Sequence, residues 1–249
     1  MLRPILWFPV ASIAMTTIHE CAHAAVAFAM GVRLTLYSYY ADLDMTPEQA
    51  VSSIPVIVRA AGPAFCLIVG MLSWLALARV RNPRLRLPLL YFAVFGIGTF
   101  FGNLMSIAFV GDFSAIADAL ALPMTLRYVI AGAGLVSLIA IHIWVGRRLL
   151  GLVPATVGRM AGTLAVIVVP ALLGTAAVVL VNQPMPASFS SARAAEASFW
   201  LFAAAGAIGT NRLKCHEPGV LEFTWADGIA AVLAAVIVRV MAHGIPLVP

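Results

Sequence analysis

The chain has 249 residues, of which 63% are hydrophobic and only 10% charged, and its mean hydropathy is +1.03. Because soluble globular domains carry about a quarter charged residues, this composition excludes a soluble globular protein and indicates an integral membrane protein. The net charge of +5 does not indicate a nucleic-acid partner, since the basic residues lie in short segments between apolar runs rather than on one face or in one arm.

The apolar runs predict the number of membrane spans. Six of them have roughly the 20 residues that a helix needs to cross a hydrocarbon core: 4–30, 56–78, 88–110, 126–146, 160–181 and 226–245. A seventh stretch, 197–210, is too short for a full span and fits an interfacial or re-entrant segment. Abundant Ala, Leu and Val without ten-residue alternation favour helices over a β-barrel. We therefore expect an all-α membrane protein, a polytopic bundle of six or seven transmembrane helices.

The first apolar run carries three ionisable groups in the sequence TTIHECAHAAVAFAMG, residues 16–31. His19, Glu20 and His23 form the pattern H-E-x-x-H. On a helix, residues four apart lie about 40° apart around the axis, so both imidazoles face a single ion. Two imidazoles on zinc leave room for a third protein ligand and a water, whose proton Glu20 can accept. The alternative is a polar patch that packs between helices, although an uncompensated charge in a span costs about 3 kcal/mol.

The segment between the first two runs contains turn and cap signals. Residues 32–40, VRLTLYSYY, are rich in β-branched and aromatic side chains, which predicts a short strand or hairpin; the alternative is a surface loop. Thr46, Pro47 and Gln49 form a capping box that predicts a short helix beginning at residue 47. Pro55 and the pair Gly62-Pro63 predict a kink where the second span begins.

Basic residues set the expected topology. They gather between the second and third runs and between the fourth and fifth, at Arg79, Arg81, Arg84, Arg86, Arg147, Arg148 and Arg159. Cytoplasmic loops are enriched in such residues, so we expect these loops and Arg3 to face the cytoplasm, with 31–55 and the region of Gly111 on the outer side. The first run is expected to be an uncleaved span. We expect a multi-pass protein of the plasma membrane.

Three stretches together resemble one enzyme family. They are the H-E-x-x-H in the first span, AAGPAFCLIVG (60–70) opening the second, and GNLMSIAFVGDFSAI (102–116) closing the third. In residues 12 to about 118 the chain resembles the site-2-protease-like intramembrane zinc metalloproteases, peptidase family M50. That family has HExxH on one core helix, a Gly-Pro pair on the next, and a metal-binding Asp beside a Gly on the one after.

The resemblance implies a role for each matching residue. His19, His23 and Asp112 would bind Zn²⁺, Glu20 would be the general base, and Asn103 would hold the substrate backbone. For Asn103, packing between helices is the alternative. The chain also departs from the family, which commonly has Asn where this chain has Cys66, the order Asp-Gly instead of Gly111-Asp112, and prolines between its Asn and Asp. We expect these departures to affect substrate handling more than metal binding.

The third ligand is the least explicit part of the site. If the first and third spans run in the same direction, their ends lie at a similar depth and Asp112, closing the third span, comes near His23. We predict that the three side chains converge on one point in a metal-free structure, with Asp118 as the alternative carboxylate.

The other histidines are not expected to bind the metal. His142 and His243 fit hydrogen-bonded helix residues better than ligands. The cluster Cys215, His216 and Glu217 lies in a predicted loop, 182–225, where adjacent residues rarely all reach one ion.

These observations predict a zinc-dependent intramembrane endopeptidase. Residues 1–125 would form its three-helix metalloprotease core, and 126–249 would supply accessory helices and a polar loop. Its partners would be transmembrane protein substrates and membrane lipids, and the oligomeric state is left open. The alternative is a catalytically silent metal-binding scaffold or a transporter. Many transporters have broken helices in two related halves, whereas in this chain the candidate site residues all lie in the first half.

Overall fold

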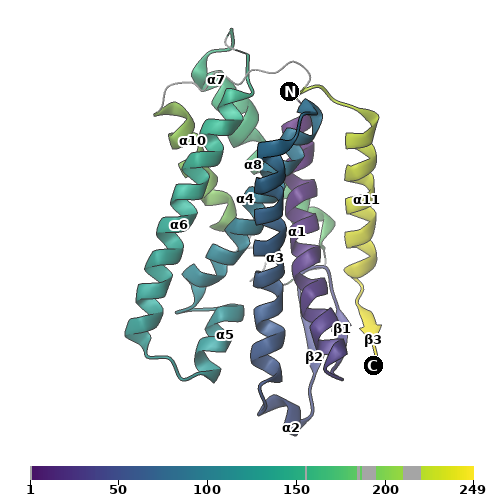
Figure 1. Ribbon diagram of the computed structural model, residues 1–249. Helices are drawn as coiled ribbons and strands as arrows, with labels where there is room; N and C mark the ends of the chain where they lie inside the picture. The colour runs from purple at the N-terminus through teal and green to yellow at the C-terminus, as the bar shows by residue number, and fades with distance from the viewer. Residues whose placement is uncertain (1, 155, 184–185, 187–194, 210–219) are drawn as a thin grey trace.

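Five of the helices in the described residues are long and apolar enough to cross a membrane. A computed structural model describes residues 2–154, 156–183, 186, 195–209 and 220–249. The five spans are α1 (Leu2–Ala29), α3 (Ile54–Arg79), α4 (Pro83–Ser106), α6 (Met124–Gly151) and the run Arg159–Val181. The last comprises α7 (Arg159–Thr163), a π-helical turn η1 (Leu164–Val168) and α8 (Val169–Val181). The helices form one bundle (Figure 1), so the predicted all-α polytopic fold is confirmed.

Two shorter helices occupy the other predicted apolar stretches. In place of the sixth span, α11 (Trp225–Met241) has 17 residues, about 25 Å of helix, and packs along α1. In the seventh stretch, α10 (Trp200–Ile208) has nine residues and packs against α6. The backbones of α6 and α10 touch, because a Cβ atom built on Gly206 would lie 2.6 Å from the carbonyl oxygen of Ile143. This helix is too short to cross the membrane.

A small antiparallel sheet lies beside the second half of α1. It contains β1 (Arg33–Leu36), β2 (Ala41–Asp44) and β3 (Ile245–Leu247), in the order β2-β1-β3. The predicted strand within 32–40 is confirmed, and β2 completes a hairpin with it; the C-terminal β3 was not predicted. The buried Leu34 and Leu36 pack toward Ala27 of α1, which fixes the register of β1 on the helix. After the hairpin, α2 (Pro47–Ala50) begins at Pro47 with the predicted capping box of Thr46 and Gln49.

Helix α3 lies between α1 and α4, and glycines set its distance from α4. A Cβ atom on Gly70 would lie 2.6 Å from the backbone nitrogen of Ile97, and one on Gly96 would lie 2.6 Å from the carbonyl oxygen of Cys66. The two backbones are therefore in direct contact, as small residues allow between membrane helices. This contact holds α3 in place, and the adjacent part of its surface, at Gly62 and Cys66, faces α1.

The position of Asp112 differs from the one expected. The sequence predicted that Asp112 closes the third span, but α4 ends at Ser106 and Asp112 is the first residue of a separate short helix, α5 (Asp112–Ala119). Residues 107–111 form the turn between the two helices, and Gly111 at its end has a φ of 99° that is incompatible with a right-handed helix. Because α5 packs against both α3 and α4, it returns Asp112 to the interior of the bundle.

A buried ion pair joins the N-terminal end of α1 to α11. Arg3 and Asp227 are 3% and 2% exposed, and Nε of Arg3 lies 2.9 Å from Oδ1 of Asp227. Arg3 also donates to the carbonyl oxygens of Val220 and Arg84, and Trp7 donates from Nε1 to Asp227 at 2.7 Å. These hydrogen bonds satisfy the guanidinium, which stabilises a charge that would otherwise be costly to bury.

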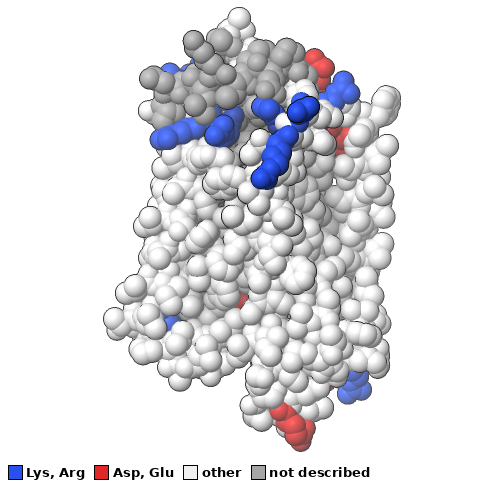
Figure 2. All heavy atoms as spheres, in the orientation of Figure 1, with Lys and Arg blue, Asp and Glu red and all other residues white. Residues whose placement is uncertain are grey.

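Figure 2 shows a group of basic residues at the end of the bundle that holds the N-terminus and α7, with isolated basic side chains elsewhere on this face. The C-terminal end of α3, the N-terminal end of α4 and the C-terminal end of α6 meet there, with Arg79, Arg84 and Arg148 among their residues. The hairpin, α2 and α5 lie at the opposite end (Figure 1).

Candidate metal centre

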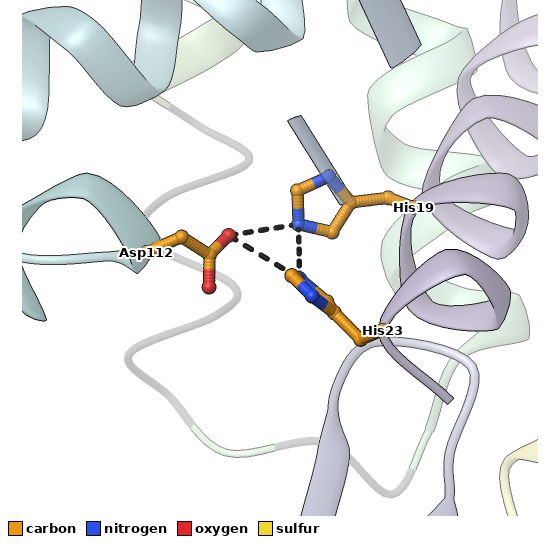
Figure 3. A group of neighbouring side chains, drawn as sticks. All are labelled: His19, His23 and Asp112. Carbon is orange, nitrogen blue, oxygen red and sulfur yellow. Dashed lines mark hydrogen bonds and ion pairs between the residues drawn. The ribbon is translucent and has the colours of Figure 1, made fainter. Parts of the chain in front are cut away.

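His19, His23 and Asp112 converge on one point inside the bundle (Figure 3). The two histidines project from one face of α1, and Asp112 approaches from the first turn of α5. Nε2 of His19 lies 2.9 Å from Oδ2 of Asp112 and 3.0 Å from Nε2 of His23, and the third side of the triangle is 3.4 Å. This is the convergence that the sequence predicts for the metal-free protein.

The far nitrogen of each imidazole contacts α3. Nδ1 of His23 lies 2.6 Å from the carbonyl oxygen of Val58. A carbonyl only accepts, so Nδ1 donates and carries the proton. Neutral His23 therefore has its lone pair on Nε2, which faces His19 and Asp112. Nδ1 of His19 lies 3.6 Å from Sγ of Cys66.

The donor set fits a zinc ion. An imidazole nitrogen with a lone pair, a second imidazole nitrogen and a carboxylate oxygen face one another, so the point between them attracts a cation. Ligand atoms about 2.0–2.2 Å from a tetrahedral zinc are roughly 3.3–3.6 Å apart, so the 2.9–3.4 Å observed here without an ion needs only a slight opening to admit one. Two histidines and one carboxylate leave a fourth position for water or substrate, as in catalytic zinc sites.

Gly62 makes the room that the two imidazoles occupy. A Cβ atom built on Gly62 would lie 2.6 Å from Cε1 of His23 and 2.8 Å from Nε2 of His19, and closer still to Nε2 of His23. Any side chain at this position would fill the space in which the two rings meet. Helix α3 runs without interruption through Gly62-Pro63, where the sequence predicts a kink, and Gly62 packs against the histidines.

The turn before α5 aims Asp112 at the histidines. Gly111 has a left-handed φ of 99°, and a Cβ atom there would lie 3.3 Å from Oγ of Ser106 and 3.4 Å from Oδ1 of Asn103. On the other side of the carboxylate, Oδ1 lies 3.9 Å from Nη1 of Arg59, whose side chain is 44% exposed. Asp112 thus offers one oxygen to the histidines and the other toward a cationic side chain.

Glu20 lies on α1 directly after the first histidine and is only 7% exposed. On an ideal helix its direction is about 60° around the axis from that of His23. A glutamate in this position is adjacent to the imidazole face without belonging to the three converging groups, which is the relation that the HExxH pattern predicts.

The side chains of Asn103 and Asp118 form their hydrogen bonds away from the point where His19, His23 and Asp112 meet. Nδ2 of Asn103 donates to the carbonyl oxygen of Thr99, one turn earlier in α4, at 3.1 Å. The structure therefore brings Asn103 beside Gly111 rather than into the triangle of ligand atoms. Asp118, the alternative carboxylate, pairs with Nη1 of Arg127 at 2.5 Å and does not meet the histidines.

The remaining histidines behave as the sequence predicts. Nδ1 of His142 hydrogen-bonds with the carbonyl oxygen of Leu138 within α6, and Nδ1 of His243, just after the end of α11, with that of Arg239. The cluster of Cys215, His216 and Glu217 lies outside the described residues. In the part of the chain that the structure describes, no other three His, Cys, Asp or Glu side chains gather closely enough to hold a metal ion.

Comparison with known proteins adds no relative to these observations. No family model, no curated protein and no solved structure matches the chain.

Proposed function

We propose that the protein is a zinc-dependent endopeptidase that hydrolyses peptide bonds in transmembrane or membrane-proximal segments of protein substrates in the plasma membrane. One observation carries the proposal: an H-E-x-x-H motif on a membrane-spanning helix has both imidazole Nε2 atoms within 3.4 Å of a carboxylate oxygen supplied by another helix. The resemblance to site-2-protease-like metalloproteases assigns the same three residues as ligands.

Each polar group of the site has a distinct role in this reaction. His19, His23 and Asp112 hold the ion, and bound zinc would acidify a water and polarise the scissile carbonyl. Glu20 accepts a proton from the attacking water and delivers it to the leaving amide nitrogen as the C–N bond breaks. Hydrolysis thus gives a new carboxylic acid, whose remaining proton passes to the new amine or to water, with Glu20 returned to its starting state.

A helical substrate must unwind before its carbonyl can reach the site, because helix carbonyls accept hydrogen bonds from the residue four positions later. We expect the unwound segment to pair with the hairpin at β2, which is one of the two edge strands of the β2-β1-β3 sheet. Such pairing satisfies the freed backbone groups of the substrate. We also expect Asn103 to contact the substrate backbone through its amide oxygen.

The test uses proteomics to compare the proteolytic fragments of membrane proteins in cells that express the native protein with those in cells that express Glu20→Gln. The amide of Gln cannot accept the water's proton, so we expect cleavage to fall by about 10²–10⁴-fold while zinc content stays near that of the native protein. His19→Ala should instead lose the metal. Fragments that disappear in both variants identify the substrates.

Two results separate this proposal from its alternatives. If Glu20→Gln cleaved a substrate of the native protein at the native rate, the mechanism would be refuted. Zinc bound at one equivalent, with the same membrane fragments in the native and Glu20→Gln cells, would identify a silent metal-binding scaffold.

A further inference from the structure

The Cys66 side chain lies against the back of the ligand His19. It is fully buried on α3, with Sγ 3.6 Å from Nδ1 of His19 and 3.7 Å from the carbonyl oxygen of Met15. We propose that Cys66 is a positioning residue for His19: its S–H donates to the Met15 carbonyl, and its sulfur accepts the Nδ1–H of His19. This inference rests on the metal site described under Proposed function.

The direction of these hydrogen bonds follows from the Met15 carbonyl. A carbonyl oxygen only accepts, so the contact with Met15 requires the thiol proton. The sulfur then has only lone pairs to offer to the imidazole, and Nδ1 of His19 must be the donor. The remaining nitrogen, Nε2, keeps its lone pair and faces Asp112 and His23, as a metal ligand requires. In the opposite direction, the thiol would donate its hydrogen bond to a lone pair on Nδ1 of His19. The proton of the neutral imidazole would then be on Nε2, which could not bind the metal.

Both ligands are held by one face of α3. Val58, Gly62 and Cys66 are four residues apart, so they lie along the same side of the helix. Val58 orients His23 through its backbone carbonyl, Cys66 orients His19 through its sulfur, and Gly62 leaves the space between them. Partners of this kind fix the tautomer and the ring direction of metal-ligating histidines, and their loss typically lowers metal affinity 10–100-fold.

Cys66 also corresponds to the position at which the resembled family commonly has Asn. From the sequence alone, this departure is expected to affect substrate handling more than metal binding. In the structure the side chain contacts a ligand histidine, so the departure should change metal affinity instead.

The test uses the full-length protein purified in detergent, with zinc affinity measured by competition with a chromogenic chelator and the site geometry by the absorption spectrum of bound cobalt. We expect Cys66→Ala to bind zinc 10–100-fold more weakly and to show a changed cobalt spectrum. Cys66→Ser, whose hydroxyl also donates and accepts, should stay within about threefold of the native affinity. Cys21→Ala is the control, since Cys21 is an exposed cysteine on the helix that carries both histidines.

The outcomes distinguish the two proposals. If the native protein binds neither zinc nor cobalt, the metal site itself is wrong. If the native protein binds zinc and Cys66→Ala binds it equally well, the positioning role is refuted while the site stands. Should Cys66→Ala fail to fold, Cys66→Val fills the space without an acceptor: weak binding by Cys66→Val and native-like binding by Cys66→Ser support the role, and equal affinities for the two overturn it.

Discussion

Gly62 and His23 are packed so closely that the imidazole occupies the place where a side chain at residue 62 would begin. The Cβ position of Gly62 lies 2.6 Å from Cε1 of His23, well inside van der Waals contact. The backbones of α3 and α4 are already in contact at Gly70, which leaves α3 little room to shift and relieve such a clash. The imidazole would have to move, and with it one of the proposed zinc ligands.

We therefore predict that Gly62→Ala loses most of its zinc while the bundle stays folded. Metal content after gel filtration, together with the thermal melting of the same sample, checks this. Gly102→Ala on α4 is the matched control, since nothing lies within 4 Å of the Cβ position of Gly102. Normal zinc content in Gly62→Ala would show that the imidazoles of His19 and His23 do not need the space beside Gly62 in order to bind the metal.

A second prediction concerns the two aspartates of α5. Asp112→Ala should reduce zinc affinity at least 10-fold, because two imidazoles alone make an incomplete site. Asp118→Ala should bind zinc normally, since Asp118 pairs with Arg127 away from the histidines. Zinc titration of both purified variants measures the difference. If Asp118→Ala lost the metal and Asp112→Ala kept it, the third ligand would be assigned to the wrong residue.

The third prediction concerns stability rather than chemistry. Arg3→Gln leaves the buried carboxylate of Asp227 without its cation, and we expect a loss of about 3–5 kcal/mol in unfolding free energy. The double variant Arg3→Gln with Asp227→Asn should recover part of this loss, because it also removes the unpaired charge. Unfolding by SDS in mixed micelles provides the measurement.

The control for this prediction is an exposed ion pair in the same protein. Arg33 and Asp44 lie 3.2 Å apart across the hairpin, with side chains 62% and 68% exposed. Arg33→Gln should therefore cost no more than about 1 kcal/mol. Equal losses for Arg3→Gln and Arg33→Gln would show that burial of the first pair does not matter.

Much of the fold followed from local sequence, because membrane spans depend on composition and length. The first, third and fourth predicted runs differ from α1, α4 and α6 by five residues or fewer at each end. The hairpin and the start of α2 were also predicted, since β-branched residues and a capping box are local signals. The strand β3 was not, because the three residues Ile245–Leu247 contain a proline and become a strand only by pairing with β1.

The site shows the same division between local and tertiary information. The positions of His19 and His23 on one helix face follow from their spacing, whereas the packing of Gly62 against both rings depends on how α3 lies against α1. The contact of Cys66 with His19 joins residues 47 positions apart, and no sequence pattern marked it. Asp112 was predicted as the third ligand, and its carboxylate does lie beside both histidines, although it begins a new helix instead of ending the span.

The fourth prediction concerns orientation in the membrane. The arginine-rich end of the bundle should face the cytoplasm, which puts α2 and the hairpin on the outer side and the site in the outer half. With Cys21 and Cys215 replaced by serine, Glu48→Cys should react with a membrane-impermeant maleimide in intact cells. Arg84→Cys should react only after permeabilisation. Both positions are exposed, so accessibility depends on the side of the membrane alone. The reverse labelling pattern would place the site in the cytoplasmic half.

The ion pair between Arg3 and Asp227 has a consequence for biosynthesis. The two residues are 224 positions apart, so at about 5–20 residues per second the ribosome makes Asp227 roughly 10–45 s after Arg3. During that interval α1 resides in the bilayer with an arginine that has no carboxylate to meet, and its long side chain can reach the phosphate headgroups. A lipid phosphate can therefore serve as the counterion of Arg3 until α11 brings Asp227.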